Sequence, residues 1–567
     1  MAKEEHVIHD QTNLLPKGRL LVVFAALASA LLISYIDQQS IGVVLPTVGR
    51  DLNSSSTIVW AGTSSLIANT AFQVLYGRLS DILGRKVILI TCLCLLALGD
   101  LLCGFAQTGT QLYAFRGVAG LANGGIMALV MMIVSDVTTL EQRGKYQGIL
   151  GSCVGMGNTI GPFIAAGFTR GVTWRATFYL IAPLALCVGV ILYFLLPPQT
   201  IPPEPLRSKL AKIDYLGILL SSSGTIILLI PISGIGTQFE ASSPMVIAML
   251  TVGGALLLLF GLNEWKLARL PMFPFRLFKN PALAAMLIQN FLIGIVFYSL
   301  LYYLPIYFQS AREIGVLTSA ALVLPIVIPQ AIASALSGQY ISRMGRYGEV
   351  IWLGYILWVI GTSLQCIFRR TFPIAAIVVI LGVEGAGVGL VFQPTLVAAQ
   401  AHSPKQDRAV VISARNFIRA LGGSAGLAIA SAIFSNSLIS HLPSDLPPAV
   451  QTRIKESIFD VPDTSSLSES QKIAVLDSYA TASRSVFYLW AGAMGCCLAL
   501  MIFIRDKGLA RKDEKTGSAN QEAGASTPSS SEEEDSGAGS EEGKRTVAEP
   551  MIREKHDSER DGSETRV

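Results

Sequence analysis

Long apolar segments follow one another along this chain of 567 residues, and they constrain its fold more than any other feature. A helix needs about 20 predominantly apolar residues to cross the hydrocarbon core of a bilayer. The apolar segments predict fourteen such spans, at residues 20–46, 57–76, 87–106, 111–135, 146–168, 176–196, 215–236, 245–264, 283–308, 316–340, 350–368, 373–396, 412–436 and 485–504. The predicted fold class is therefore an all-α integral membrane protein.

The composition agrees with a chain that lies mostly in lipid. Of the residues, 51% are hydrophobic and 14% are charged, whereas about 25% are charged in a soluble domain. This composition excludes a nucleic-acid-binding protein. The eight cysteines fall in apolar segments without the His partners of a zinc site, and we therefore expect no metal and no cofactor. No Walker A sequence is present, which argues against an ATP-driven pump, and no catalytic constellation predicts an enzyme.

The basic residues predict the orientation in the membrane. Loops that face the cytosol carry an excess of Lys and Arg. Basic residues gather after the even-numbered spans, at Arg78, Arg85, Lys86, Arg143, Lys145, Lys266, Arg269, Arg276, Lys279, Arg343, Arg346, Lys405 and Arg408. We therefore expect residues 1–18 to form a cytosolic N-terminal segment. The polar residues 505–567 are expected to form a disordered cytosolic tail.

One short loop sequence occurs twice in the chain, in similar form. GRLSDILGRK begins at Gly77 between spans 2 and 3, and GQYISRMGR begins at Gly338 between spans 10 and 11. If spans 7 and 8 are an insertion, the same loop stands at the same place in two six-helix halves, residues 19–196 and 283–504, joined by a linker at 197–282. Internal repeats of this kind are how many secondary transporters build alternating access to a central site.

Several motifs carry a resemblance to a known family. The first loop matches the cytoplasmic motif G-x-L-a-D-x-x-G-R-K of the major facilitator superfamily, and LYAFRGVAGLANGG in span 4 resembles its motif with one intramembrane arginine, Arg116. Span 5 carries the spacing of the antiporter motif at Gly148, Gly157, Gly161 and Pro162. YIDQQSIGVVLPTV in span 1 resembles the signature of the fourteen-span fungal drug:proton antiporters. The sequence departs from these patterns at Gln39, Ala119, Ala165 and Ser342.

The resemblance implies a major facilitator fold, with two six-helix halves plus two inserted helices. It also implies that the first loop, with Gly77, Asp81, Gly84, Arg85 and Lys86, acts as a conformational latch. Asp81 is expected to pair across the interface between the halves. The alternative is a turn that only sets the topology. Two further charged residues at the cytosolic end of span 4, Asp136 and Arg143, are assigned to the same latch.

Charges inside apolar spans indicate a function or a partner, because each costs at least ~2.5 kcal/mol in hydrocarbon. Asp37 and Arg116 lie at similar depth and are expected to form a pair in which Asp37 binds and releases the coupled proton or contacts the substrate. The alternative for Asp37 is a structural hydrogen bond at a helix junction. Glu384 lies among glycines as a second proton site or the counter-charge of a cationic substrate. Asp100 is expected to be a polar partner of Arg116 or an interface residue. Asn53 begins a glycosylation sequon that lies close to the membrane.

The leading interpretation is a proton-coupled antiporter of the plasma membrane that exports small organic molecules such as drugs, toxins or secondary metabolites. The alternative is a vacuolar proton-coupled transporter of basic amino acids, favoured by a dileucine sorting pattern from Asp10 to Leu15. A non-transporting receptor is disfavoured because Asp37, Arg116 and Asp81 are all present. The expected partners are a small-molecule substrate, protons and the lipid bilayer, and the expected state is a monomer.

Overall fold

The structure is a computed structural model. It describes residues 15–509, apart from 55–56, 198–204, 235–238, 240–242, 269, 405–406, 444–445, 448–450, 452–453 and 455–467. The chain separates into two compact units after Arg511, and every described residue belongs to the first. Residues 505–509 of the predicted disordered tail are described, and Asp506 accepts hydrogen bonds from the backbone N–H groups of Tyr347 and Gly348. The rest of the predicted tail and most of the N-terminal segment, including the dileucine pattern up to Leu14, lie outside the described residues.

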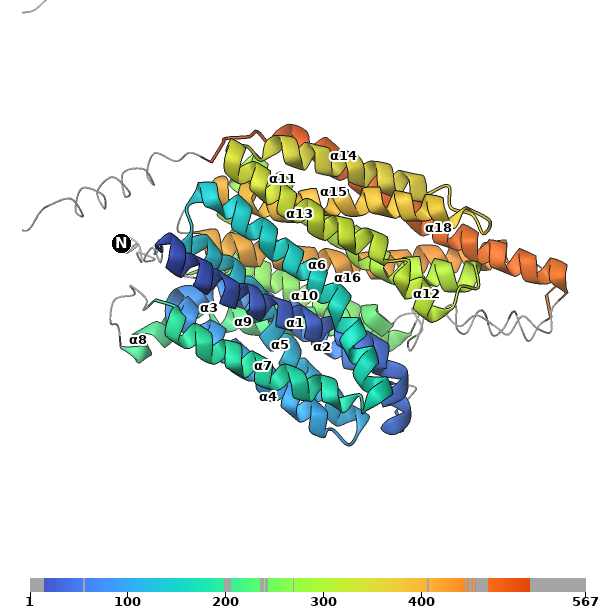
Figure 1. Ribbon diagram of the computed structural model, residues 1–567, viewed down its shortest axis with the longest axis horizontal. Helices are drawn as coiled ribbons and strands as arrows, with labels where there is room; N and C mark the ends of the chain where they lie inside the picture. The colour runs from blue at the N-terminus through green and yellow to red at the C-terminus, as the bar shows by residue number, and fades with distance from the viewer. Residues whose placement is uncertain are drawn as a thin grey trace, which may run out of the picture. The chain divides into compact units, whose positions relative to one another are not determined.

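The described residues form helices throughout (Figure 1). The N-terminal half contains α1 (Lys17–Asp51), α2 (Trp60–Gln73), α3 (Leu75–Leu83), α4 (Arg85–Phe105), α5 (Gly109–Val137), α6 (Leu140–Gly171) and α7 (Arg175–Leu195). The linker contains α8 (Leu206–Ala211), α9 (Tyr215–Gly234), α10 (Pro244–Lys266) and the 3-10 helix η1 (Phe275–Lys279). The C-terminal half contains α11 (Pro281–Ile306), the π-helix η2 (Tyr307–Ala311), α12 (Val316–Ala321), α13 (Leu324–Met344), α14 (Gly348–Gln365), α15 (Ile374–Ala401), α16 (Arg408–His441), α18 (Glu469–Leu500) and the 3-10 helix η5 (Met501–Phe503).

Twelve helices in the described part of the chain are long and apolar enough to cross a membrane, which confirms the all-α membrane class. The two remaining predicted spans fall on shorter elements. Span 57–76 corresponds to α2, with 14 residues, and the start of α3. Span 350–368 corresponds to α14, with 18 residues. The count of fourteen stays a prediction.

Several helices run well beyond the predicted spans. Residues 437–484, which separate the predicted spans 412–436 and 485–504, are helical at both ends, because α16 continues to His441 and α18 begins at Glu469. Ser468 and Gln471 form a capping box, which satisfies backbone N–H groups at the start of α18. Hydropathy detects only the part of a helix that lies in hydrocarbon, so the polar ends of these helices were missed.

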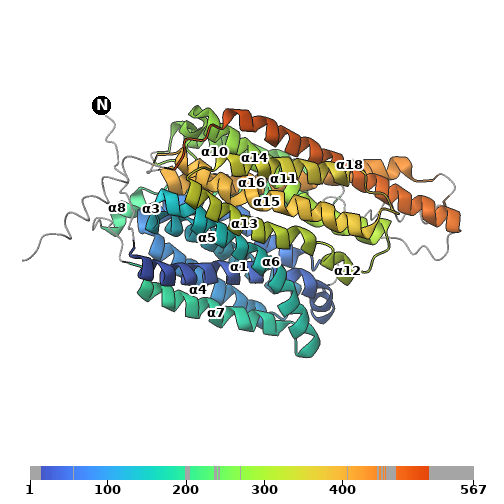
Figure 2. The same ribbon diagram turned by 45° about the horizontal axis from the view of Figure 1, so that its top comes forward.

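The two halves meet through helices far apart in the sequence. Helix α6 packs against α13, and α3 packs against α16, as both views show for the first pair (Figure 2). The repeated loops lie at these two contacts. A Cβ on Gly77 would stand 2.8 Å from Ser413 Oγ, and a Cβ on Gly338 would stand 2.3 Å from the carbonyl oxygen of Gly144. Each repeat therefore supplies a glycine that lets a helix of one half approach a helix of the other.

The inserted helices α9 and α10 pack against each other. Helix α9 also contacts α2 and α16, one from each half. The face of α10 away from these contacts carries exposed Leu258, Leu262 and Trp265, as expected for a helix that faces lipid.

Candidate functional site: a polar cavity between the halves

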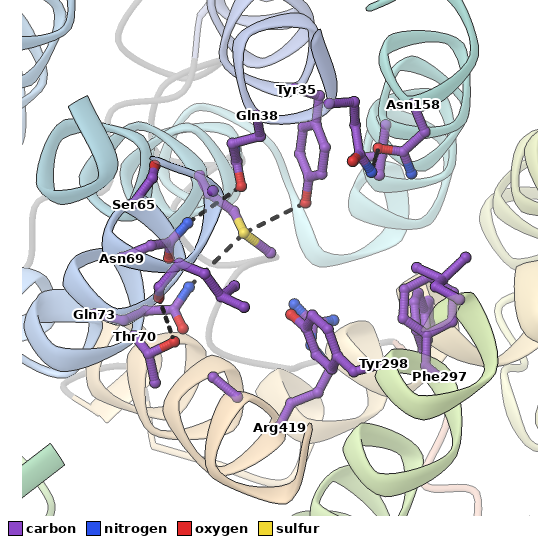
Figure 3. A pocket seen from close by; sticks show the side chains of 18 of the residues that line it. Tyr35, Gln38, Ser65, Asn69, Thr70, Gln73, Asn158, Phe297, Tyr298 and Arg419 are labelled. Carbon is purple, nitrogen blue, oxygen red and sulfur yellow. Dashed lines mark hydrogen bonds between the residues drawn. The ribbon is translucent and has the colours of Figure 1, made fainter. Parts of the chain in front are cut away.

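A cavity of about 280 Å³ lies between the two halves. Side chains from α1, α2, α5, α6, α11, α13, α15 and α16 line it (Figure 3). Its wall is rich in amide side chains, namely Gln38, Gln39, Asn69, Gln73, Asn158, Gln330 and Gln393. No Asp or Glu belongs to this lining among the described residues. Such a wall offers many hydrogen bonds and no negative charge.

The N-terminal half contributes a wall whose polar groups bind one another. Asn69 donates to Gln38 Oε1 at 3.2 Å, and Gln39 donates to Asn158 Oδ1 at 3.0 Å. Tyr35 points its hydroxyl toward the cavity, with its oxygen 3.4 Å from Met127 Sδ (Figure 3). These contacts fix the rotamers and so shape the cavity before any ligand binds.

The C-terminal half contributes a positive charge. Arg419 on α16 points into the cavity, with its Cζ 5.2 Å from the centre of the Phe392 ring. One turn earlier, the buried Arg415 donates to the carbonyl oxygen of Phe392 at 2.5 Å and to Thr395 Oγ1 at 3.3 Å. No acidic side chain within the described ranges forms an ion pair with either arginine. An uncompensated cation is costly in a membrane interior, and a bound anion would remove that cost.

Neither Arg415 nor Arg419 was predicted as a site residue. They lie inside the predicted span 412–436, and an arginine inside an apolar span is the same signal that singled out Arg116. The signal was therefore present in the sequence.

A buried ionic cluster lies beside the cavity. Arg116 donates from Nη1 to Asp37 Oδ1 at 2.5 Å, and Asn123 donates to Asp37 Oδ2 at 2.6 Å. Asp100 Oδ1 lies 3.6 Å from the same Nη1. Asp37, Asp100, Arg116 and Asn123 are all 0% exposed. The structure thus brings together three of the four predicted intramembrane residues.

One glycine and one hydroxyl group position the side chains of this cluster. A Cβ on Gly99 would stand 3.0 Å from the backbone nitrogen of Ala119, so Gly99 lets α4 bring Asp100 close to α5. Ser34 donates to Asn123 Oδ1 at 2.7 Å, and the amide nitrogen of Asn123 therefore faces Asp37. The cluster is held by three helices, α1, α4 and α5.

Glu384 does not join this cluster. It lies between α14 and α15, where Trp358 Nε1 donates to it at 3.2 Å and Gln365 donates to its other oxygen. A Cβ on Gly361 would stand 2.6 Å from Glu384 Cβ, so α14 approaches α15 closely at this point. Glu384 is absent from the cavity lining that the described residues form. The structure gives it two hydrogen-bond donors within the C-terminal half.

The predicted latch residues form a network at the end of the bundle that carries Arg78, Arg85 and Lys86, here named the basic end. Asp81 pairs with Arg85 at 3.3 Å and with Arg78 at 3.4 Å. Burial raises the pKa of the Asp81 carboxyl, and the guanidinium groups of Arg85 and Arg78 act in the opposite direction. Both partners belong to the same half as Asp81. Arg78 also forms an ion pair across the interface between the halves, with Asp407 directly before α16, at 3.8 Å.

The other latch residues join neighbouring helices within the N-terminal half. Arg85 binds Asp136 at 2.7 Å, and Arg143 donates from Nε to the carbonyl oxygen of Ser135 at 3.0 Å. Lys86 donates to the carbonyl oxygen of Leu196 at 2.9 Å, beyond the end of α7. Gly84 has a φ of 101°, a conformation that side-chain-bearing residues rarely adopt.

The antiporter-motif glycines of α6 serve two different contacts. A Cβ on Gly148 would stand 2.5 Å from the carbonyl oxygen of Ser334 on α13. At Gly157 it would stand 2.6 Å from Tyr35 Cβ, and at Gly161 it would stand 2.9 Å from the carbonyl oxygen of Ile36, both on α1. Pro162 lies inside α6, which continues through it.

Asn53 lies between α1 and α2 and has a φ of 50°. The last residue of its sequon, at position 55, lies outside the described residues. Its glycosylation stays a prediction.

Comparison with known proteins decides the family. The model of the Major Facilitator Superfamily matches residues 27–427. The chain belongs to the major facilitator superfamily. Solved members share its fold: the proton:xylose symporter XylE aligns with a TM-score of 0.59 at 12% identity, over 89% of this chain and 99% of that one. The human organic anion transporter MFSD10 aligns with a TM-score of 0.55 at 15% identity, over 86% of this chain and 100% of that one. At such identities the likeness shows the fold alone.

Several fungal transporters are more similar to this chain in sequence than these two solved structures are. Citrate exporter 1 of Yarrowia lipolytica is 48% identical over 518 residues, 91% of this chain and 77% of that protein. MFS-type transporter clz4 of Cochliobolus lunatus is 37% identical over 502 residues, 88% of each chain. Efflux pump dotC of Dothistroma septosporum is 31% identical over 424 residues, 75% of this chain and 73% of that protein. The chain is a multi-pass membrane transporter and not an enzyme.

Proposed function

We propose that this facilitator exports small organic anions in exchange for protons, with carboxylates such as citrate as the substrate class. The observation that carries the proposal is Arg419, a cation in the central cavity with no acidic partner in the described part of the chain. The buried Arg415 adds positive charge one turn away. The similarity to a citrate exporter and to efflux pumps supports both the substrate class and the direction.

Proton coupling is proposed for the buried cluster beside the cavity. Arg116 lines the cavity and also binds Asp37, so that one side chain belongs to both sites. An acid that gains and loses an arginine partner changes its affinity for protons, which is the physical requirement for coupling. Glu384 is proposed as a structural acceptor for Trp358 and Gln365 rather than as part of the proton path.

Alternating access is proposed to act through the basic end. Ser152 donates to the carbonyl oxygen of Ala331 at 2.6 Å, and Ser334 donates to that of Gly148 at 3.1 Å, both across the interface between the halves. If the basic loops face the cytosol, as their charge predicts, this conformation is closed toward the cytosol. Opening would then break these contacts together with the Arg78–Asp407 pair.

The exporter interpretation favours the plasma membrane, a monomer, and the fourteen-span antiporter subfamily. The alternative, uptake of basic amino acids into the vacuole, requires a carboxylate that meets a cationic substrate. The described lining offers two arginines, Arg116 and Arg419, and no carboxylate. The cavity therefore disfavours a cationic substrate.

The test is counterflow exchange in proteoliposomes with labelled citrate, labelled lysine and an uncharged apolar dye. We expect citrate to exchange and lysine not to exchange. Arg419→Gln should abolish citrate exchange, because it removes the positive charge of Arg419 and keeps a polar side chain at that position. Arg346→Gln is the matched control, since Arg346 is an exposed arginine paired only to the equally exposed Glu349 among the described ion pairs. Exchange of lysine but not of citrate would refute the proposal.

A further inference from the structure

Resting on the proton coupling proposed above, we infer that Asp100, and not Asp37, carries the coupling proton in this conformation. Both residues are buried acids beside Arg116, and the motif resemblance points to Asp37 alone. The hydrogen bonds around the two carboxyl groups separate their roles.

The charges of the buried cluster do not balance when all of its groups are ionised. Three ionisable side chains meet at this site, two acids and one arginine, and all three are 0% exposed. Fully ionised, the cluster would hold one negative charge in excess inside the bundle. An uncompensated charge is expensive there, and a buried acid without a partner takes up a proton instead. One proton makes the cluster neutral.

The hydrogen bonds around the two acids identify which of them holds this proton. Each oxygen of Asp37 accepts one hydrogen bond. Oδ1 accepts from the charged Arg116 at 2.5 Å, and Oδ2 accepts from the neutral Asn123 at 2.6 Å. Donors aimed at both oxygens stabilise the ionised form. Neither oxygen of Asp100 accepts a hydrogen bond, and its nearest cationic atom, Arg116 Nη1, lies 3.6 Å away. The neutral, protonated acid is therefore Asp100.

No other described group changes this balance. The charged or titratable side chains that face Asp100 are Asp37 from α1, Arg116 from α5, and Cys103 on its own helix. Helix α7 contributes Phe178, whose ring centre lies 5.8 Å from Arg116 Cζ. An aromatic ring favours the cation and supplies no further negative charge.

Arg116 offers a route by which Asp100 can release its proton. Arg116 Nε and Nη2 have no hydrogen-bond partner, so the guanidinium retains donors for a second carboxylate. A small rotation that brings Arg116 to Asp100 would favour the ionised form of Asp100, which then gives its proton to water. The guanidinium stays protonated throughout. Rocking of the halves would drive this rotation, because Arg116 also borders the cavity between them.

The proton is located by infrared spectroscopy of the purified full chain, in which a protonated carboxylic acid absorbs apart from a carboxylate. The spectra are taken in the Glu384→Gln background, because Glu384 is a second fully buried acid whose hydrogen-bond donors, Trp358 and Gln365, are neutral. We expect the difference between spectra with and without Asp100→Asn, at neutral pH, to show the loss of a protonated-acid band. A difference spectrum without that band would overturn the assignment.

Coupling is tested in proteoliposomes with labelled citrate. We expect Asp100→Asn to keep citrate counterflow, which also shows that the variant folds, and to lose citrate accumulation driven by a pH gradient. Accumulation by Asp100→Asn at the wild-type level would refute only the role of Asp100. A wild-type protein that exchanges citrate but ignores the gradient would refute the proposed coupling itself.

Discussion

Replacing Gly148 by alanine should shift the equilibrium between the conformations closed and open at the basic end. The added Cβ would stand 2.5 Å from the carbonyl oxygen of Ser334 and 2.8 Å from Gly338 Cα, whereas real Cβ contacts essentially never fall under 3.0 Å. Both atoms belong to the backbone of α13 and cannot turn aside. The two helices must therefore separate by roughly half an ångström or more, as overpacking in a tight interface requires.

The expected size follows from the cost of overpacking, about 1–3 kcal/mol. A free energy of 1–3 kcal/mol changes an equilibrium by about 5–150-fold, and here it acts against the conformation in which α6 and α13 touch. Gly167→Ala is the matched control, because it lies on the same helix with nothing within 4 Å of the added Cβ. Any gain in helix propensity from alanine is common to both variants.

The assay is a distance distribution between spin labels at Lys145 and Arg343, exposed residues near the basic ends of α6 and α13. The labels are placed in a variant without the eight native cysteines. We expect the long-distance population to grow in Gly148→Ala and to stay at the wild-type level in Gly167→Ala. Equal distributions in the two variants would show that the contact does not hold the closed conformation, and the reasoning would fail.

Three further predictions concern single residues. Arg116→Gln leaves buried carboxyl groups without their cation and should lower the free energy of unfolding by about 3–5 kcal/mol, seen as an earlier thermal transition in detergent; an unchanged transition would contradict the buried pair. Gly84→Ala forces a side chain into a φ of 101° and should cost about 1–3 kcal/mol in the same assay, whereas Gly18→Ala, with nothing within 4 Å, should not. Glu384→Gln should keep citrate exchange, because Glu384 lies outside the described lining; complete loss of exchange would place it in the substrate path.

The sequence predicted the features that depend on hydropathy and on depth in the membrane, namely the apolar spans and the meeting of buried charges. Arg116 and Asp37 could be expected to meet because both lie at similar depth in two spans of the same half. The polar start of α18 at Glu469 was not predicted, because a helix outside the hydrocarbon region carries no hydropathy signal. Arg419 was overlooked although its charge within an apolar span was visible.

Other features depend on which way a side chain faces, and this follows from helix packing rather than from position along the chain. Glu384 sits mid-span among glycines, but most of these glycines face α13. Gly361 of α14 lets Glu384 approach that helix, where its carboxylate accepts hydrogen bonds from Trp358 and Gln365. Asp81 was expected to pair across the halves, and its described ion pairs are with Arg78 and Arg85 of its own half. Arg78 lies one turn earlier on α3 and forms an ion pair with Asp407 across the interface between the halves.

The most direct measurement is equilibrium binding to the purified protein of citrate and of its uncharged trimethyl ester. If Arg419 recognises an anion, citrate binds and the ester does not, and Arg419→Gln weakens citrate binding at least tenfold, or about 1.4 kcal/mol. Equal binding of citrate and the ester, or citrate binding unchanged by Arg419→Gln, would contradict an anion site in the cavity.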